Sequence, residues 1–344
     1  MTGVYAESGK LPSEGKLAAS FGVSRMTVRV ALDELVRQGL IEKRNGAGSF
    51  LTKRAARRSG LIGLVIPDYA DYGFFAAIKS EVERHAARLG YRVELVFTRE
   101  RNREAAVLEM RRKVRELAAA RAEGIIFRPF VAEERAGASR EIVSIFRHAE
   151  IPVVLIDADI TRPPARSDCD LVSVDNIAAG RRIAEHLHER GYQRIGFLMQ
   201  SKAPHANANW SNRLFGLAGE LALIGHDEGV RQLRFSPDDS KALSKLLHSR
   251  QWTDAIVCGN DEEAAALLNA LAVCGKRVPE DIAVIGFDDI PLARTLTPPL
   301  TTVSQPVRKI AAAAFKALLA RIRYPNNDPR EIYLPAPLVV RRSS

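Results

Sequence analysis

Hydrophobic residues after position 60 are grouped in short, nearly continuous runs, with longer amphipathic segments between them. The segments 75–90 and 178–191, for example, repeat apolar residues at the spacing of a helix. Strands covered on both faces have continuous apolar runs, so this alternation predicts parallel sheets flanked by helices, an α/β fold. The runs span residues 61–67, 92–97, 124–129, 151–157, 171–175, 194–199, 230–235, 255–260 and 282–289. So many strands favour two doubly wound lobes, which bind ligands at the carboxyl ends of their strands.

The N-terminal segment follows a different pattern. Ser13 is placed to cap a first helix that carries Leu17, Ala18 and Phe21. Gly22 then ends this helix, because glycine tolerates the positive φ of a tight turn.

A second helix is predicted between Ser24, which caps it, and Gly39, which ends it. Its apolar residues recur at i, i+3, i+4 and i+7 and form an inward stripe of Val28, Ala31, Leu32 and Leu35. The first turn therefore presents Arg25, Met26 and Arg29 outward. A basic hairpin with Gly46 and Gly48 at its tip follows. Two helices and such a hairpin are the layout of a winged helix-turn-helix, whose second helix lies in the major groove of DNA.

Residues 11–51 resemble the gluconate-repressor (GntR) family of bacterial regulators, through the motifs LPSE, LA..FGVSR.TVR.AL..L...GL and G.GSF. The resemblance implies DNA contacts from four residues of the second helix, namely Ser24, Arg25, Thr27 and Arg29. It also implies that the wing tip, at Gly46 and Gly48, enters the minor groove. Two guanidinium groups one turn apart can bond phosphates or a guanine edge, and a helix N-terminus favours phosphate.

The chain departs from that family in two places. The family has an arginine after LPSE where this chain has Gly15, so one contact is absent or is supplied by Lys16. The family also has a helix before Leu11, and the chain starts about where that helix would end. We therefore expect residues 1–52 to form a winged helix-turn-helix domain without its first helix, unless the start is assigned too late. Residues 53–60, with four basic residues and no apolar periodicity, predict a linker.

Positive charge is concentrated in this N-terminal module. The chain of 344 residues has a formal net charge of +10, and residues 1–58 hold eleven basic against five acidic residues. A basic module on a nearly neutral body predicts a head that binds a polyanion. With 46% hydrophobic and 27% charged residues, the composition excludes a disordered or fibrous chain. No membrane span or secretory signal is evident and the three cysteines are widely spaced, so we expect a cytoplasmic protein without membrane association.

Residues 60–342 resemble the lactose-repressor and periplasmic sugar-binding protein family. The motifs that carry the resemblance are GFFAAIKSEVERHAARLGY, VDNIAAGRRIAEHLHERGYQRIGFL, RLFG, CGNDEEA, and VPEDIAVIGFDD followed by TPPLTTVSQP. The resemblance implies a two-lobed domain over residues 61–344 that binds a ligand and forms a homodimer. A GntR-type head on such a body is similar to the arrangement of bacterial arabinose repressors.

The same resemblance implies a small polar ligand, such as a sugar, between the lobes. The family's ligand contacts fall on Phe74, Phe75, Asp157, Arg213, Phe235, Asn260, Asp288 and Gln305. This set suits a polyol, because aromatic rings stack on the apolar face of a sugar while carboxylates and amides bond its hydroxyls. Many sugar-binding members have a further arginine where this chain has Ser211, so the identity of the ligand stays open.

Several acidic and aromatic residues of the body also have a purely structural interpretation. Asp288 could cap the next helix or hold a turn, and Phe75 could belong to the core. Asp261 and Asp175 are each interpreted as helix N-caps.

The sequence does not indicate an enzyme. His186 and His188 are two apart on a predicted helix and point to different faces, so a shared metal ion is not expected. Cys258 ends an apolar strand, which is typical of a buried cysteine. Residues 45–48 lack the third glycine of a dinucleotide loop and precede a strand. We therefore predict a ligand-responsive repressor that binds operator DNA as a homodimer, without cofactor or metal. The alternative is a cytoplasmic small-molecule sensor whose truncated head does not bind DNA.

Overall fold

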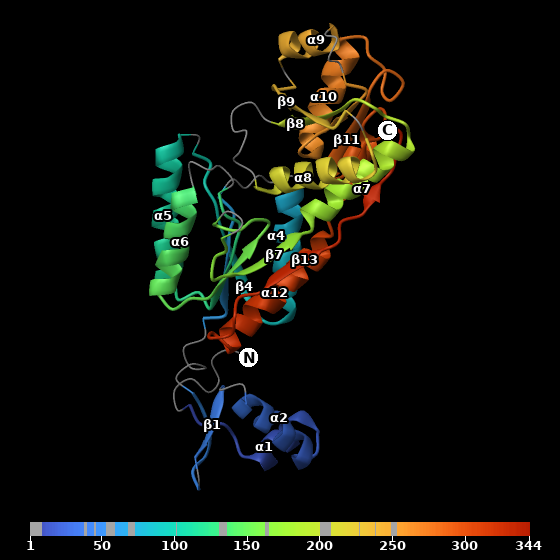
Figure 1. Cartoon of the computed structure of the whole chain (residues 1–344). Coiled ribbons are helices and arrows are strands. Elements are labelled where there is room, and N and C mark those ends of the chain that lie inside the picture. Colours follow the sequence, from blue (N-terminus) through green and yellow to red (C-terminus); the bar gives the residue numbers. More distant parts are fainter. Residues whose placement is uncertain are drawn as a thin grey trace.

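The computed structural model consists of a small N-terminal head and a body of two lobes (Figure 1). The head lies at the end of the first lobe that is remote from the second lobe. The structure describes residues 9–37, 40–44, 46–52, 59–67, 73–100, 102–130, 136–161, 165–199, 208–226, 228–237, 239–248 and 253–344.

The head contains the two predicted helices and the predicted hairpin. They are α1 (Glu14–Phe21), α2 (Arg25–Arg37), β1 (Ile41–Arg44) and β2 (Gly48–Leu51), with the two strands antiparallel. The Ser13 hydroxyl accepts a hydrogen bond from the Lys16 amide at the start of α1, and Gly22 ends that helix at φ 66°. Ser24 caps α2 by accepting from the Thr27 amide at 3.1 Å. These helix boundaries confirm the interpretation of both serines and of Gly22.

The core of the head is narrower than the predicted stripe. Val28 and Leu32 are buried together with Ala18, and Leu35 packs against them, as predicted. Ala31, however, is exposed, because it lies at the edge of the stripe. Phe21 is also exposed. The predicted inward stripe is therefore wrong at Ala31, and Gly39 lies outside the described residues.

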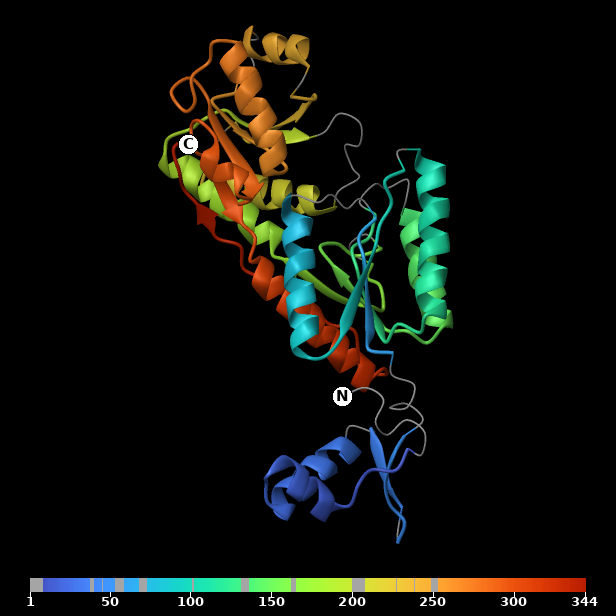
Figure 2. The ribbon, with the colours of Figure 1, turned by 180° about the vertical axis from the view of Figure 1, so that it is seen from behind.

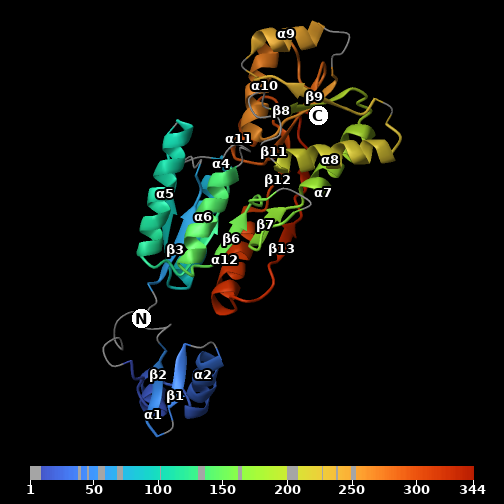
Figure 3. The same cartoon turned by 60° about the vertical axis from the view of Figure 1, so that its left-hand side comes forward.

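The first lobe is a six-stranded parallel sheet in the order β13-β7-β6-β5-β3-β4. Its strands are β3 (Leu61–Val65), β4 (Arg92–Val96), β5 (Gly124–Phe127), β6 (Val153–Ile156), β7 (Asp170–Val174) and β13 (Glu331–Leu334). Helices α5 (Arg103–Ala119) and α6 (Ala136–His148) cover one face (Figure 3). Helices α4 (Gly73–Arg88) and α12 (Val307–Arg323) lie side by side on the other face (Figure 2).

The second lobe repeats this architecture with the sheet order β14-β12-β11-β10-β8-β9. Its strands are β8 (Ile195–Met199), β9 (Val230–Arg234), β10 (Ala255–Val257), β11 (Ala283–Asp288), β12 (Thr301–Ser304) and the antiparallel β14 (Leu338–Val339). Its helices are α7 (Asn176–Glu189), α8 (Ala208–Leu223), α9 (Ser240–His248), α10 (Asp261–Val273) and α11 (Leu292–Thr295). None of the helices in the described part of the chain could cross a membrane.

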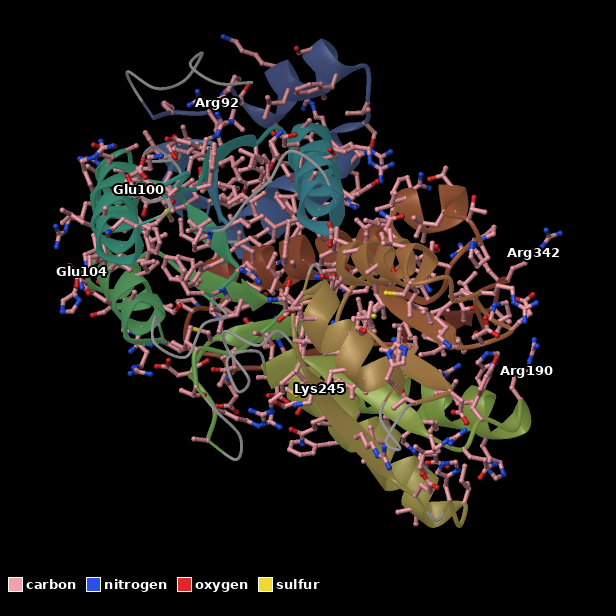
Figure 4. The ribbon with its side chains drawn as sticks, turned by 90° about the horizontal axis from the view of Figure 1, so that it is seen from above. Arg92, Glu100, Glu104, Arg190, Lys245 and Arg342 are labelled. Atoms are coloured by element: carbon pink, nitrogen blue, oxygen red, sulfur yellow. The ribbon has the colours of Figure 1, made fainter. Side chains whose placement is uncertain are left out.

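A single hydrophobic core joins the two lobes. Its side chains come from α4, α12 and the first sheet on one side, and from α7, α8 and the second sheet on the other. The chain passes between the lobes three times, before α7, before α12 and between β13 and β14. The six charged residues labelled in Figure 4, which lie on both lobes, are exposed.

The linker predicted at residues 53–60 lies largely outside the described residues. Its last two residues already bond to the body: the Ser59 hydroxyl donates to the carbonyl of Arg121, and the Gly60 amide donates to the Glu123 carboxylate. These two contacts fix the point at which the first lobe begins.

Candidate functional site

A pocket lies at the carboxyl ends of the strands of the first lobe, where the chain passes to the second. It is lined by Phe74, Phe75, Ile78, Ile156, Asp157, Val172, Ser173, Val174, Gln305 and Ile310. The structure thus gathers Phe74, Phe75, Asp157 and Gln305 of the predicted set around one space. The two phenylalanine rings meet edge to face at 5.0 Å, so the pocket combines an aromatic wall with polar groups.

Asp157 connects the two lobes. Its Oδ1 atom accepts a hydrogen bond from Asn209 of α8 at 2.7 Å, across the boundary between the lobes. Its Oδ2 atom lies 3.4 Å from Nε of Arg128, whose guanidinium lies over the Phe75 ring at 4.7 Å. The backbone of Asp157 has a φ of 73°, an angle that aspartate adopts more readily than most residues. A ligand that binds Asp157 would therefore also affect the contact between the lobes.

Arg213 is the centre of the polar network on the second lobe. It is 4% exposed, and it donates to the Asn176 side chain at 2.8 Å and to the carbonyl of Gly259 at 2.5 Å. Its guanidinium carbon lies 3.3 Å from the centre of the Phe287 ring. Burial lowers the pKa of Arg213 to about 10, which leaves it charged at neutral pH. Asn176 in turn bonds to Asn209, so the network reaches Asp157.

Asp288 ends β11 in a strained backbone conformation with a φ of 118°. It accepts a hydrogen bond from Nε2 of Gln305 at 2.6 Å. Burial raises the pKa of Asp288 well above its ordinary value, and the charge of Arg213 only partly opposes this effect. In either protonation state a carboxyl group can accept a hydrogen bond from a hydroxyl.

Two of the predicted ligand contacts have structural roles here. Asn260 caps α10, because its side chain accepts from the Glu263 amide at 2.7 Å. Phe235 is 7% exposed and packs in the core of the second lobe beside Leu243, away from the residues that line the pocket. Asp175 caps α7, as predicted.

The interpretation of Asp261 as a helix cap is wrong by one residue. Asp261 is the first helical residue, fully buried, and it accepts from the Thr302 hydroxyl at 2.5 Å and from the Ile290 amide at 2.9 Å. Burial raises its pKa to about 7. Its carboxyl group therefore ties α10 to strand β12 and to the segment that follows β11.

Sequence reasoning missed Arg128, Asn176, Asn209 and Trp210. Arg128 directly follows the buried strand β5, a position at which the rule of strand ends could have found it. Trp210 lies one residue beyond Asn209 on α8, and its ring is so close to Gly259 that a Cβ atom there would lie 2.4 Å from it. This close approach explains why residue 259 is glycine, but the residues meet only in the tertiary structure.

The outward face of the head carries the residues predicted to meet DNA. Arg25, Thr27 and Arg29 are exposed on α2, while the hydroxyls of Ser24 and Thr27 bond to each other at 2.8 Å. In the hairpin, φ is 73° at Gly46 and 107° at Gly48, conformations that favour glycine. Beside them, the guanidinium of Arg44 lies over the Phe50 ring at 4.5 Å.

The residues weighed for catalysis or metal binding lie apart from this pocket. His186 is buried and bonds to the Ser344 hydroxyl at 2.9 Å, whereas His188 is exposed, so the two rings do point to different sides of α7. Cys258 is fully buried, as predicted, and burial raises the pKa of its thiol well above its ordinary value.

Known proteins resemble both parts of the chain. The model of the periplasmic binding protein-like domain matches residues 184–344, and that of the bacterial regulatory proteins of the gntR family matches residues 1–51. The HTH-type transcriptional repressor PurR of Vibrio vulnificus is 30% identical over 286 residues, covering 81% of this chain and 80% of the relative. A LacI family transcriptional regulator from Enterococcus faecium, solved with bound ribose, is 25% identical with a TM-score of 0.66, and covers 83% of this chain and 98% of that one.

The chain belongs to the LacI family of transcriptional regulators.

The resemblances inferred from the motifs are thereby confirmed: this LacI-family regulator carries a gntR-type head on a body like the periplasmic binding proteins. Its likeness extends to a solved complex of the transcriptional regulator CelR with cellobiose, with a TM-score of 0.69 at 25% identity, covering 97% of this chain and all of the other. The predicted fold of two parallel-sheet lobes is confirmed as well, and the chain is a ligand-responsive transcriptional regulator.

Proposed function

We propose that this regulator represses transcription by binding operator DNA through residues 1–52. A sugar or sugar derivative that binds to residues 61–344 raises or lowers the affinity for the operator. The observation that carries the proposal is the hydrogen bond from Asn209 of the second lobe to Asp157 in the pocket of the first. Because this bond spans the lobes, a ligand at Asp157 changes how they meet. The ribose and cellobiose in the two solved relatives support a polyhydroxyl effector.

The effector site proposed here contains all the predicted residues, which contribute in different ways. Phe74 and Phe75 offer ring faces, and the four polar groups around them bond hydroxyls: Asp157, Arg213, Asp288 and Gln305. Asn260, which caps α10, and Phe235, which packs in the core of the second lobe, stay in the proposed set as contacts that need a further closure of the lobes. Two lobes that pack on one core but bond across a polar network can shift by a small rotation.

The DNA interface proposed here is the exposed start of α2 together with the wing. Its members are Ser24, Arg25, Thr27, Arg29, Gly46 and Gly48. Two heads of a cytoplasmic homodimer would occupy successive major grooves, about 34–36 Å apart. A ligand that changes this spacing alters operator affinity, and such coupling is typically about 1–3 kcal/mol.

A titration of fluorescent operator DNA tests the proposal. The duplex is the palindrome nearest the regulator's own gene, titrated with and without ribose, cellobiose and related sugars. Arg29→Ala should weaken operator binding tenfold or more and leave sugar affinity intact, whereas Asp288→Ala should do the reverse. DNA binding that no sugar changes would contradict the ligand response. Sugar binding without any DNA binding would instead favour a sensor with an inactive head.

A further inference from the structure

The first turn of α1 touches the two arginines at the start of α2, Arg25 and Arg29. Nε and Nη2 of Arg29 donate to the same oxygen of Glu14, at 3.3 and 3.1 Å. The guanidinium of Arg25 lies over Gly15, where a Cβ atom would be 3.3 Å from its Nη2. The start of α1 therefore packs against both arginine side chains.

The contact with Glu14 uses one particular edge of the Arg29 guanidinium. A guanidinium has a side edge, made of Nε and Nη2, and an end edge, made of Nη1 and Nη2. Glu14 occupies the side edge, and among the described residues it is the one hydrogen-bond partner of Arg29. The Arg29 side chain remains 57% exposed, so its end edge is accessible.

We propose that Glu14 is a positioning residue that turns the end edge of Arg29 toward O6 and N7 of one guanine in each operator half-site. The proposal rests on the proposed function, namely that α2 enters the major groove. An arginine end edge matches the two guanine acceptors as a bidentate pair, the commonest specific contact in the major groove. A freely rotating arginine would have to lose its rotamer freedom on binding, and Glu14 removes part of that cost beforehand.

The negative charge of Glu14 lets an experiment distinguish a positioning role from simple repulsion of DNA. A carboxylate on a DNA-facing surface repels phosphates, so removing one should raise affinity for any DNA. If Glu14 positions Arg29, its removal should instead lower affinity for the operator alone. Glu42 is a matched control, because its carboxylate also holds an arginine, Arg44, at 2.6 Å but within the hairpin.

The experiment measures binding of the full chain to three duplexes: the operator, the operator with 7-deazaguanine replacing each half-site guanine in turn, and a scrambled sequence. Loss of N7 at one guanine should weaken the unaltered protein about tenfold. Glu14→Gln should bind the operator several-fold more weakly, lose most of the penalty at that guanine, and bind the scrambled duplex at least as well. Glu42→Gln should keep the penalty in full, and Glu14→Asp, which retains a carboxylate, should restore part of it.

Other results would overturn the proposal. One is a Glu14→Gln protein that binds every duplex as tightly as before and keeps the full 7-deazaguanine penalty. Another is equal weakening on operator and scrambled DNA, which would reveal general damage to the head. Failure of the unaltered protein to prefer its operator would contradict the proposed function itself and is distinguished from both.

Discussion

The two lobes each bury one aspartate completely, but they accommodate its charge in opposite ways. In the first lobe, Asp170 accepts from Arg321 at 3.0 Å and from Arg330 at 3.1 Å. In the second, Asp261 accepts hydrogen bonds from a hydroxyl and a backbone amide, both neutral. Burial opposes the charge of Asp170, yet the two guanidinium groups outweigh it and the pKa of that carboxyl falls below its ordinary value, whereas burial raises the pKa of Asp261 to about 7. The partners, rather than the depth of burial, decide whether the charge is kept.

The largest difference in stability is expected between the matched substitutions Asp170→Asn and Asp261→Asn, which remove a charge-paired and a neutrally bonded carboxyl group. Asp170→Asn leaves the largely buried guanidinium of Arg321 without its counter-charge and should lower the free energy of unfolding by about 3 kcal/mol. Asp261→Asn replaces a carboxyl that is easily protonated and should cost about 1 kcal/mol or less. Urea denaturation monitored by circular dichroism measures both. Equal losses would show that the partners do not matter.

The pH dependence of stability should also differ between the lobes. Since the pKa of Asp261 is higher in the folded protein than in the unfolded chain, its contribution is present below the unfolded pKa and is lost as the pH rises to about 7. One such carboxyl changes the free energy of unfolding by at most about 1.4 kcal/mol per pH unit. Urea denaturation between pH 5 and pH 7 should therefore show a shallower decline for Asp261→Asn than for the unaltered protein. Parallel curves would contradict the assignment to Asp261.

At acid pH the effect of Asp170 has the opposite sign. Its folded pKa is depressed, so its contribution is present above the unfolded pKa and is lost as the pH falls through the folded one. When the urea series is extended below pH 3.8, the ordinary pKa of an aspartate, Asp170→Asn should flatten the decline in stability, whereas Asp261→Asn should leave it unchanged.

The contact between the lobes should respond to Asn209→Ala. This change removes the bond to Asp157 and should lower the free energy of unfolding by about 1–2 kcal/mol. It should also increase the radius of gyration of the ligand-free protein in small-angle scattering, because the lobes lose a polar tie. Asn212→Ala, the same substitution one turn along α8, is the control and should leave the radius unchanged.

The smallest effect on stability is expected where the head meets the body. Arg323, the last residue of α12, donates to Glu34 of α2 at 3.3 Å, and both side chains are partly exposed. Glu34→Gln should change the free energy of unfolding by less than about 0.5 kcal/mol. It should nevertheless reduce the effect of sugar on operator affinity. An unchanged sugar response would indicate that the signal passes by another route.

In the two lobes, the strands were predictable where apolar residues recur, and not elsewhere. The nine runs correspond to β3 through β11. The inner strands are nearly continuous hydrophobic runs because parallel strands buried on both faces need them, whereas the edge strands β4 and β9 mix apolar and charged residues. Strand β12 was not predicted because Thr301 and Thr302 are polar although fully buried. The edge strand β13 was not predicted either, since it leaves Tyr333 half exposed and so lacks a continuous apolar run. The two-residue β14 is too short to have a pattern of its own.

The pocket was predictable in outline but not in its connections. Strand ends and family motifs identified Asp157 and Gln305, whereas the bond from Asn209 depends on how the second lobe packs onto the first. The exact N-cap of α10 was harder to predict, because Asn260 and Asp261 are both good N-cap residues. A shift of one position exchanges their roles.

Helix α12 extends from the pocket to the head. Ile310, in its first turn, lines the pocket, and Arg323 at its other end contacts Glu34 of α2 in the head. A helix of 17 residues is about 25 Å long, so a tilt of about 5° at the pocket moves its far end by about 2 Å. Under the proposed function the helix acts as a lever: a displacement at the pocket too small to disturb the core becomes, at the head, large enough to break a hydrogen bond.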